Sequence, residues 1–427
     1  IPTKVSNKMK YIINGNLAPI AYFKGDSRGL ISSLSTRRDG LITLEDISAE
    51  LLNLNGIEIP LAIGDRIHIK DETNNIEKAK DLFKKSINLI WITSIFHGIV
   101  YMLQAYSAYQ LYKDKKDKLN NINTYNNFII INIFISLLMG ASSLHINIAL
   151  YLFINLLATY IITIFISDKD INIIGLFSAL TYALIIWGIL FYPDIIYNSY
   201  IGFNNLFYGA RYYGLNNGIM GVLLVTSVIS YSFIEKLIPN KFIKNLICLL
   251  YLLLNMIVLS ANYGANTGGF LTSVVLFLFM LYRNILNKNW NIKNVLILIF
   301  TGLGLFYTNM YFDYFSHEKS HAIEFFVRIK GFGIVEFLDM FKIKAKELVK
   351  FTLLPPFSIV IFAQIILLKK LLIEGYRGHR IEVRTTLIIA LIGFILNDTG
   401  MITFIYVIHY LISLLIYYDI ENFSKIQ

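Results

Sequence analysis

The chain has 427 residues, 56% of them hydrophobic, with a formal net charge of +10 and only 15% charged residues. Ordinary soluble domains carry about 25% charged residues, so the composition argues against a large soluble enzyme and indicates a multi-pass membrane protein. The basic residues lie mostly in short loops between apolar runs, which membrane topology explains better than nucleic-acid binding does.

The first 70 residues differ from the rest because they contain no long apolar run. GLITLEDI (40–47) is expected to form a strand, and SAELLNLNG (48–56) a short helix that Ser48 starts and Gly56 ends. Residues 71–85, DETNNIEKAKDLFKK, are expected to form a charged linker. The chain begins IPTKVSNKMK, without an initiator methionine or an apolar leader, which predicts either a fragment lacking its upstream part or a trimmed chain.

About eleven apolar segments follow from Ser86 onward, and most have the length of a membrane helix. They are residues 87–108, 127–144, 147–167, 172–192, 217–234, 242–260, 268–282, 293–312, 355–372, 383–396 and 401–418. The seventh and tenth are short for a hydrocarbon core of about 30 Å, so they are expected to be tilted or re-entrant. The predicted fold class is therefore mainly α, a polytopic helical membrane protein. Spans 1–8 occupy residues 86–312 and spans 9–11 occupy residues 351–427.

Lysine and arginine divide the connecting loops into two sets. The loops after spans 1, 3, 5, 7 and 9 are basic, whereas those after spans 2, 4, 6 and 10 contain only Arg211. The positive-inside rule therefore places the N-terminal segment outside the plasma membrane and, with eleven spans, the C-terminus in the cytoplasm. The lysines between Lys78 and Lys85 and the basic stretch 313–350 oppose this assignment, but both belong to long extramembrane parts, where the rule is weak.

Residues 313–350 have aromatic and aliphatic residues at helical spacing among basic ones, divided by Gly331 and Gly333. This pattern predicts two amphipathic helices in the membrane interface. The alternative is that they pack against the extramembrane segment.

Polar residues gather in the loops predicted to lie outside. Each Asn/Gly-rich loop directly precedes a helix start, where free backbone amides and their partial positive charge favour an anion. An arginine adds a planar, two-pronged contact to phosphate. The residues expected to contact such a headgroup are Arg211, Asn216, Asn217, Asn266, Thr267, His317, His321, Asn397 and Asp398.

Each of these features has a simpler alternative. Asn-Gly loops are common turns, and Arg211 also suits an anchor at the level of the lipid headgroups. His317 and His321 have the spacing of a metal-binding pair with Glu318 nearby, yet a structural pair is the simpler interpretation, so no metal ligand is assigned. The single cysteine, Cys248, offers neither an intramolecular disulfide nor a thiolate zinc site. No serine triad, phosphate-binding loop or GxGxxG motif is present, so the catalytic residues are unknown.

Several segments resemble a bacterial membrane-protein family of the alkaline-phosphatase superfamily. SSLSTRRDGLITLEDISAELLNLNGIEIP (32–60) is similar to the closing segment of that family's catalytic domain, with Ser35-Thr36-Arg37-Arg38 at its serine-threonine-arginine-arginine run. GARYYGLNNGIMGV is similar to the family's GARYYGIGNEYMGV, with Gly218 where the family has glutamate. GANTGG, SHEKSH and LNDTG are similar to the corresponding family motifs, and together the motifs cover most of residues 30–400.

This resemblance implies that residues 1–70 are the C-terminal end of an extracytoplasmic phosphatase-like α/β domain that precedes the membrane domain. The layout is similar to that of the ethanolamine-phosphate transferases of glycolipid-anchor synthesis. Chemistry of this superfamily uses a Ser/Thr nucleophile and two divalent metals, often zinc, held by Asp and His. The resemblance places these groups upstream of residue 1, and it gives His68 no role.

The leading hypothesis is a membrane-embedded phosphatase or phospho-group transferase whose membrane domain binds the headgroup of a lipid-phosphate or polyprenyl-phosphate. Its partners are expected to be membrane lipids, with no nucleic acid. The alternative is a transporter or lipid flippase with an accessory soluble domain, because broken helices around Asn/Gly loops also suit a transport site. A third class is a structural membrane scaffold, for which substitutions of the polar loop residues have little effect.

Overall fold

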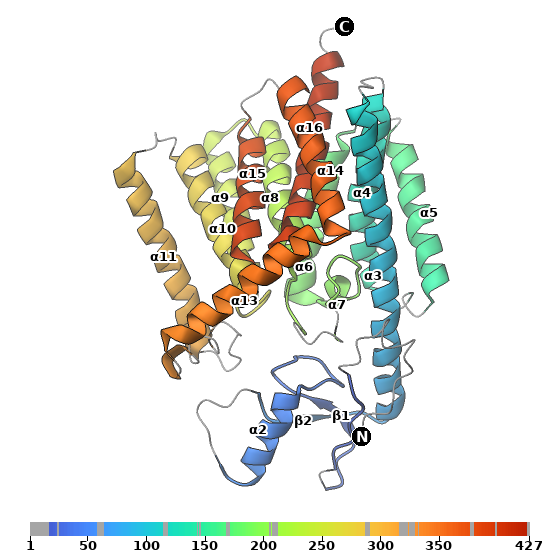
Figure 1. Cartoon of the computed structure of the whole chain (residues 1–427), viewed down its shortest axis with the longest axis vertical. Helices are drawn as coiled ribbons and strands as arrows, with labels where there is room; N and C mark the ends of the chain where they lie inside the picture. The colour runs from blue at the N-terminus through green and yellow to red at the C-terminus, as the bar shows by residue number, and fades with distance from the viewer. Residues whose placement is uncertain are drawn as a thin grey trace.

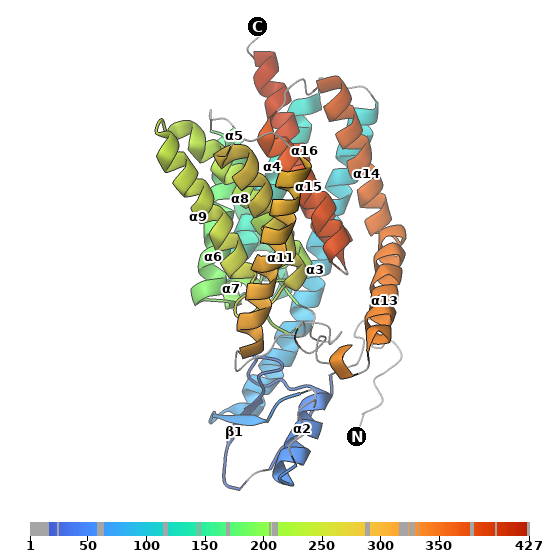
Figure 2. The same cartoon turned by 90° about the vertical axis from the view of Figure 1, so that its left-hand side faces the viewer.

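The computed structural model describes residues 17–23, 25–57, 64–113, 118–142, 144, 147–167, 171–204, 206, 212–286, 291–315, 323, 329–331, 333–375, 380–397 and 399–424. Within these residues the chain is mostly helical, with two short strands near its N-terminus. Long helices stand side by side as a bundle, and the N-terminal segment lies beyond one end of it, as Figure 1 and Figure 2 show from two directions.

The N-terminal segment contains a two-stranded antiparallel sheet of β1 (Gly29–Ser32) and β2 (His68–Asp71), and one helix, α2 (Leu44–Leu54). The strand predicted over residues 40–47 is wrong, because only Leu41 forms a bridge and the chain turns helical at Leu44. Between residues 17 and 71, the described part of the chain therefore contains two short strands and one helix.

A capping box explains why α2 begins earlier than predicted. The Thr43 side chain accepts a hydrogen bond from the Asp46 amide, and the Asp46 carboxylate accepts one from the Thr43 amide. These reciprocal bonds satisfy two free donors at the helix start, so Ser48 lies inside the helix and does not cap it. Gly56 follows the end of α2 as expected, with a left-handed φ of 68° that glycine adopts without strain.

Helix α3 (Asn75–Tyr112) is a continuous helix of 38 residues that joins the N-terminal segment to the bundle. Residues 75–85, expected to form a linker, are its first turns. They contain no proline or glycine, and they include four lysines together with Glu77, Ala79 and Leu82, all of which favour helix. The N-terminal segment is therefore attached through a helix.

Every one of the eleven predicted spans coincides with a helix. After α3 these are α4 (Leu119–Gly140), α5 (Ile148–Ser167), α6 (Ile173–Phe191), α8 (Asn217–Leu237), α9 (Lys241–Leu259), α10 (Thr267–Met280), α11 (Ile292–Phe315), α14 (Phe357–Lys370), α15 (Ile381–Leu396) and α16 (Gly400–Ser424). Among the described residues, eight helices are long and apolar enough to cross a membrane, namely α3, α4, α5, α6, α8, α9, α11 and α16.

The helices α10, α14 and α15 are shorter, with 14, 14 and 16 residues. The short seventh and tenth spans agree with the sequence. The ninth begins at Phe357 because the chain bends by 71° between α13 (Ile334–Leu353) and α14, next to Pro355 and Pro356. Single π-helical stretches, η4 (Leu281–Ile285) and η5 (Leu371–Gly375), extend α10 and α14.

Helix α13 is the second of the two amphipathic helices predicted for residues 313–350. Most of its described side chains are exposed, and its main contacts are with α14 and α16. The first predicted amphipathic helix falls mostly outside the described residues.

The centre of the bundle is formed by α8 and α16. Of the most apolar stretch of each helix, 89% and 83% are buried inside the protein, against 6% for α11 at the periphery. Both central helices begin at the end of the bundle that faces the N-terminal segment (Figure 1). The polar loops that precede α8 and α16 therefore lie at the middle of that end.

Close backbone packing fixes one of these loops. The short helix α7 (Asp194–Tyr197) crosses the end of α4 so tightly that a Cβ atom on Gly140 would lie 2.0 Å from the Ile195 carbonyl oxygen. Asn198 adds a hydrogen bond of 3.1 Å from its Nδ2 to the Gly140 carbonyl oxygen. Only glycine permits this approach.

We predict that Gly140→Ala destabilises the protein by about 1–3 kcal/mol, because the added methyl forces α7 away from α4. Gly304→Ala is the control, since a Cβ at this helical position in α11 meets no atom within 4 Å. Thermal unfolding of the purified, detergent-solubilised variants measures both. A Gly140→Ala variant as stable as Gly304→Ala would contradict the tight contact.

Candidate functional site

A turn in the N-terminal segment, residues 33–38, is held by one buried carboxylate. Asp46 accepts hydrogen bonds from the hydroxyls of Ser33 and Ser35, at 2.7 and 2.6 Å, and from the amides of Thr43 and Asp65, at 2.7 and 2.8 Å. Four donors compensate the burial of the charge. The turn is thereby fixed on the start of α2.

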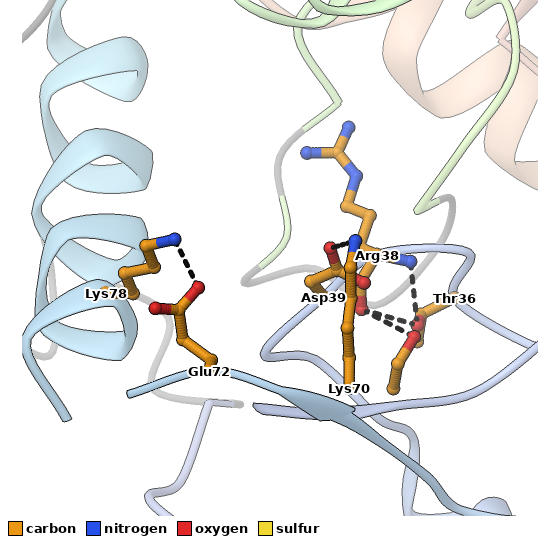
Figure 3. A network of polar contacts seen from close by, with 7 residues as sticks. Thr36, Arg38, Asp39, Lys70, Glu72 and Lys78 are labelled. Carbon is orange, nitrogen blue, oxygen red and sulfur yellow. Dashed lines mark hydrogen bonds and ion pairs between the residues drawn. The ribbon is translucent and has the colours of Figure 1, made fainter. Parts of the chain in front are cut away.

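Surface ion pairs join this turn to β2 and α3. Asp39 pairs with Lys70, and Glu72 pairs with Lys78 at the start of α3. Figure 3 shows both pairs, with the Arg38 side chain extending from the turn in the direction of the loop ribbons above it. The main-chain amide of Arg38 donates to the Thr36 hydroxyl at 3.3 Å, which fixes the position from which this side chain extends.

The two arginines of the turn contact the loop between α7 and α8. The Nε of Arg38 donates to the Tyr212 carbonyl oxygen, and its guanidinium lies 4.6 Å from the centre of the Tyr197 ring. The Arg37 guanidinium lies 4.1 Å from the centre of the Tyr213 ring. Cation–π contacts of this kind stabilise a guanidinium that has lost part of its water. Arg37 has a φ of 50°, an unusual conformation for a non-glycine residue.

The Arg38 guanidinium retains one unused donor. Its side chain is half-buried, but the Nη2 atom is enclosed and has no hydrogen-bond partner in the described structure. Burial lowers the pKa of Arg38, while Tyr197 and Asp194 oppose that shift. Arginine nevertheless remains protonated in proteins. A buried cationic donor without a partner is expensive, so this atom marks a position where an acceptor would bind.

Charges around Arg38 are mainly positive. We call the place where the turn 33–38 meets α7 and the loop before α8 the junction. Lys85 of α3 interacts electrostatically with both Arg38 and Asp194 across it. Arg37 adds a further positive charge, and the exposed Asp194 carboxylate is the one negative charge of these four groups. The sum of three positive charges and one negative charge favours an anion.

At the base of this junction, asparagine side chains cap helices α8 and α10. Asn216 Oδ1 accepts from the amides of Gly218 and Ile219, at 2.9 and 3.0 Å. Asn266 Oδ1 accepts from the Gly269 amide at 2.8 Å. The sequence predicted that backbone amides at these helix starts would bind an anion. In the structure, asparagine side chains of the chain itself accept their hydrogen bonds.

The same side chains connect the loops. Asn266 Nδ2 donates to the Leu215 carbonyl oxygen at 2.8 Å and to Asn217 Oδ1 at 3.1 Å. Asn217 Nδ2 donates to the Thr399 hydroxyl at 2.6 Å, and the main-chain carbonyl oxygen of Asn217 accepts from the Thr403 hydroxyl at 2.9 Å. We call Asn216, Asn217, Asn266 and Thr399 the loop network. It joins the starts of α8, α10 and α16.

Two further predicted residues lie beside this network. Asn397 is buried and donates from Nδ2 to the Gly393 carbonyl oxygen at 2.8 Å. A Cβ on Gly268 would lie 2.2 Å from Asn397 Oδ1, so the end of α15 packs directly on the start of α10. Thr267 is the half-buried first residue of α10.

The structure thus brings together Asn216, Asn217, Asn266, Thr267 and Asn397, five of the nine residues predicted to bind an anion. Arg211, His317, His321 and Asp398 lie outside the described residues. Sequence reasoning missed Arg38 as a site residue, although it identified the Arg37-Arg38 pair within the family resemblance. The available signal was the pair of adjacent arginines itself.

Nothing in the described part of the chain brings three His, Cys, Asp or Glu side chains close enough to hold a metal ion. In comparisons with known protein families, curated proteins and solved structures, the chain matched none.

We predict that Asn266→Ala destabilises the protein by about 2–4 kcal/mol, because it removes a helix cap and two bonds between loops. Asn240→Ala is the matched control. Asn240 also caps a helix, accepting from the amides of Phe242 and Ile243, but it is exposed. Its loss is expected to cost about 1 kcal/mol. Equal losses of thermal stability would show that Asn266 acts only as a cap.

Proposed function

We propose that this integral membrane protein belongs to a phosphatase or phospho-group transferase system and binds an anionic, lipid-linked headgroup where its N-terminal segment meets the bundle. The observation that carries the proposal is the enclosed, unpartnered Nη2 of Arg38. A phosphate monoester offers several oxygens to a planar guanidinium and prefers it to other side chains. Such a ligand would satisfy this donor.

The position of the junction supports a lipid-linked ligand. Arg38 contacts the loop that leads into α8, a helix of membrane-spanning length. A headgroup at this level would keep its hydrocarbon chain in the bilayer beside the bundle. The loop network would hold the backbone of residues 212–217 in place while Arg37, Arg38 and Lys85 supply charge.

In this proposal the N-terminal segment is extracytoplasmic and the C-terminus cytoplasmic, as the distribution of Lys and Arg predicts. The phosphatase-like chemistry, with its Ser/Thr nucleophile and divalent metal, would be supplied by a catalytic domain other than the described residues. The membrane domain would capture the headgroup and present it to that catalytic domain. Arg211, His317, His321 and Asp398 remain predicted contacts.

A second function, transport or flipping of a lipid, is favoured by one observation. Polar side chains also pair inside the bundle, as Gln104 does with Gln364 at 2.7 Å and Asn132 with Asn155 at 2.6 Å. A transport path needs polar groups of this kind at the level of the membrane interior. Movement of a labelled lipid phosphate across proteoliposomes that contain the full chain would favour this function over headgroup presentation.

We predict that Arg38→Ala weakens binding of a short-chain polyprenyl monophosphate about tenfold or more, because a charged hydrogen bond is lost. Arg38→Lys keeps the charge but not the planar fork, so an intermediate loss is expected. Arg66→Ala, which removes an exposed arginine of the same segment, is the control. Equilibrium binding to the full chain in lipid nanodiscs, with inorganic phosphate as competitor, measures all three.

Unchanged affinity in Arg38→Ala with normal expression would remove the observation on which the proposal rests. The same assay on Arg211→Ala and Asp398→Ala tests the residues predicted from sequence alone. If none of the three variants changes affinity, headgroup binding at this end of the bundle is wrong.

A further inference from the structure

Buried polar atoms without a hydrogen-bond partner gather in one part of the bundle. In the described structure they include the hydroxyls of Tyr151, Ser178, Thr181, Tyr200 and Tyr410, the Asn126 Nδ2 and both ring nitrogens of His409. We call these residues the interior cluster. Each is nearly or fully buried, and they come from α4, α5, α6, α16 and the loop that follows α7.

Pairwise neighbours connect the members of the interior cluster. Tyr200 interacts electrostatically with both Tyr410 and Tyr151, and its ring stacks on Phe96 with centres 4.8 Å apart. The Phe96 ring also meets the Tyr151 ring edge-on, with centres 6.2 Å apart. Tyr410 approaches Thr181 of α6, yet neither hydroxyl closes a hydrogen bond. Ser178 lies one helical turn from Thr181, on the same face of α6.

The interior cluster also includes His409 of α16. His409 precedes Tyr410 and approaches the backbone of Asn126 on α4. The imidazole has neither nitrogen bonded within the described residues, although the residue is only 1% exposed. A neutral imidazole offers one donor and one acceptor, so two bonds are missing at this position.

Several unsatisfied polar groups in one place require a common explanation. Buried side-chain polar atoms in folded proteins nearly always have a partner, which is either protein or ordered water. A small bridging molecule would satisfy several of these groups at once. A buried water molecule forms about three hydrogen bonds, and the interior cluster has enough donors and acceptors to bind water in this way.

The composition of the cluster excludes an ionic ligand. It contains phenols, aliphatic hydroxyls, an amide and an imidazole, but no lysine, arginine, aspartate or glutamate. An ion without a counter-charge is costly in a membrane interior. The matching ligand is small, uncharged and able to donate and accept, which describes water.

We propose that ordered water occupies the interior cluster and extends from Tyr200, in the loop beside the candidate site, to His409 in the bundle. Tyr200 joins the two regions because its amide donates to the Ser136 hydroxyl of α4 at 3.1 Å, and it lies three residues after Tyr197 of α7, which contacts Arg38. The interior is thus a hydrated site separate from the guanidinium site, and it does not depend on anion binding.

Thiol accessibility tests this proposal. Ser178→Cys is introduced together with Cys248→Ala, which removes the chain's single native cysteine. The full chain in nanodiscs is then treated with methyl methanethiosulfonate, a small uncharged reagent. The matched control is Ser230→Cys, because Ser230 is equally buried at 0% exposure but its hydroxyl donates to the Ser227 carbonyl oxygen at 3.3 Å.

A hydrated interior predicts that Ser178→Cys reacts about tenfold faster than Ser230→Cys, because thiol reactivity follows contact with water. Equal, slow rates for both cysteines would overturn the proposal.

Thermal unfolding provides a second measurement that does not depend on a cysteine. If water satisfies the Tyr410 hydroxyl, Tyr410→Phe loses hydrogen bonds and lowers the melting temperature. If the interior is dry, removal of an unpartnered hydroxyl raises it, and the proposal is wrong. Tyr182→Phe calibrates the scale, since the Tyr182 hydroxyl donates to the Tyr251 carbonyl oxygen at 3.2 Å and its loss is destabilising in either case.

Discussion

One amide side chain, that of Asn266, holds together the end of the bundle that faces the N-terminal segment. It caps α10 and bonds both to the backbone before α8 and to Asn217, which in turn bonds to Thr399 before α16. Helix ends in an apolar surrounding leave backbone groups that must find partners inside the protein. The loop network meets this requirement for α8 and α10, and it connects both to the start of α16. The Tyr212 carbonyl oxygen, which accepts from Arg38, lies three residues before Leu215, which Asn266 holds in place.

The sequence predicted the helices well because the length of an apolar run is a local property. Prediction from the sequence failed where two local patterns competed. Residues 40–47 alternate like a strand, but the Thr43–Asp46 capping box starts a helix inside them. The polar composition of residues 75–85 resembled a linker, yet Glu, Lys and Ala also favour helix, and attachment to a long span extends it. Both errors lie in the N-terminal segment, where no long apolar run fixes the structure.

The candidate site was predictable only in part. Asparagine before a helix start is a recognisable signal, but the partners of Asn217 are 49 and 182 residues away along the chain. No spacing rule reveals such pairs. The signal for an anion at the helix starts was also ambiguous, because an asparagine that caps a helix uses the amides an anion would need. The unsatisfied donor instead comes from Arg38, a residue 174 positions from its partner Tyr212.

The continuous helix α3 gives the molecule a mechanical property. With 38 residues it is a rod of about 57 Å, based in the N-terminal segment and passing Gln104, whose side chain is bonded to α14. Contacts with α4 and α14 hold the part of this rod that lies in the bundle, so the part outside the bundle carries the N-terminal segment as an extension of it. A change of about 5° in the direction of a rod of this length would displace its end by about 5 Å.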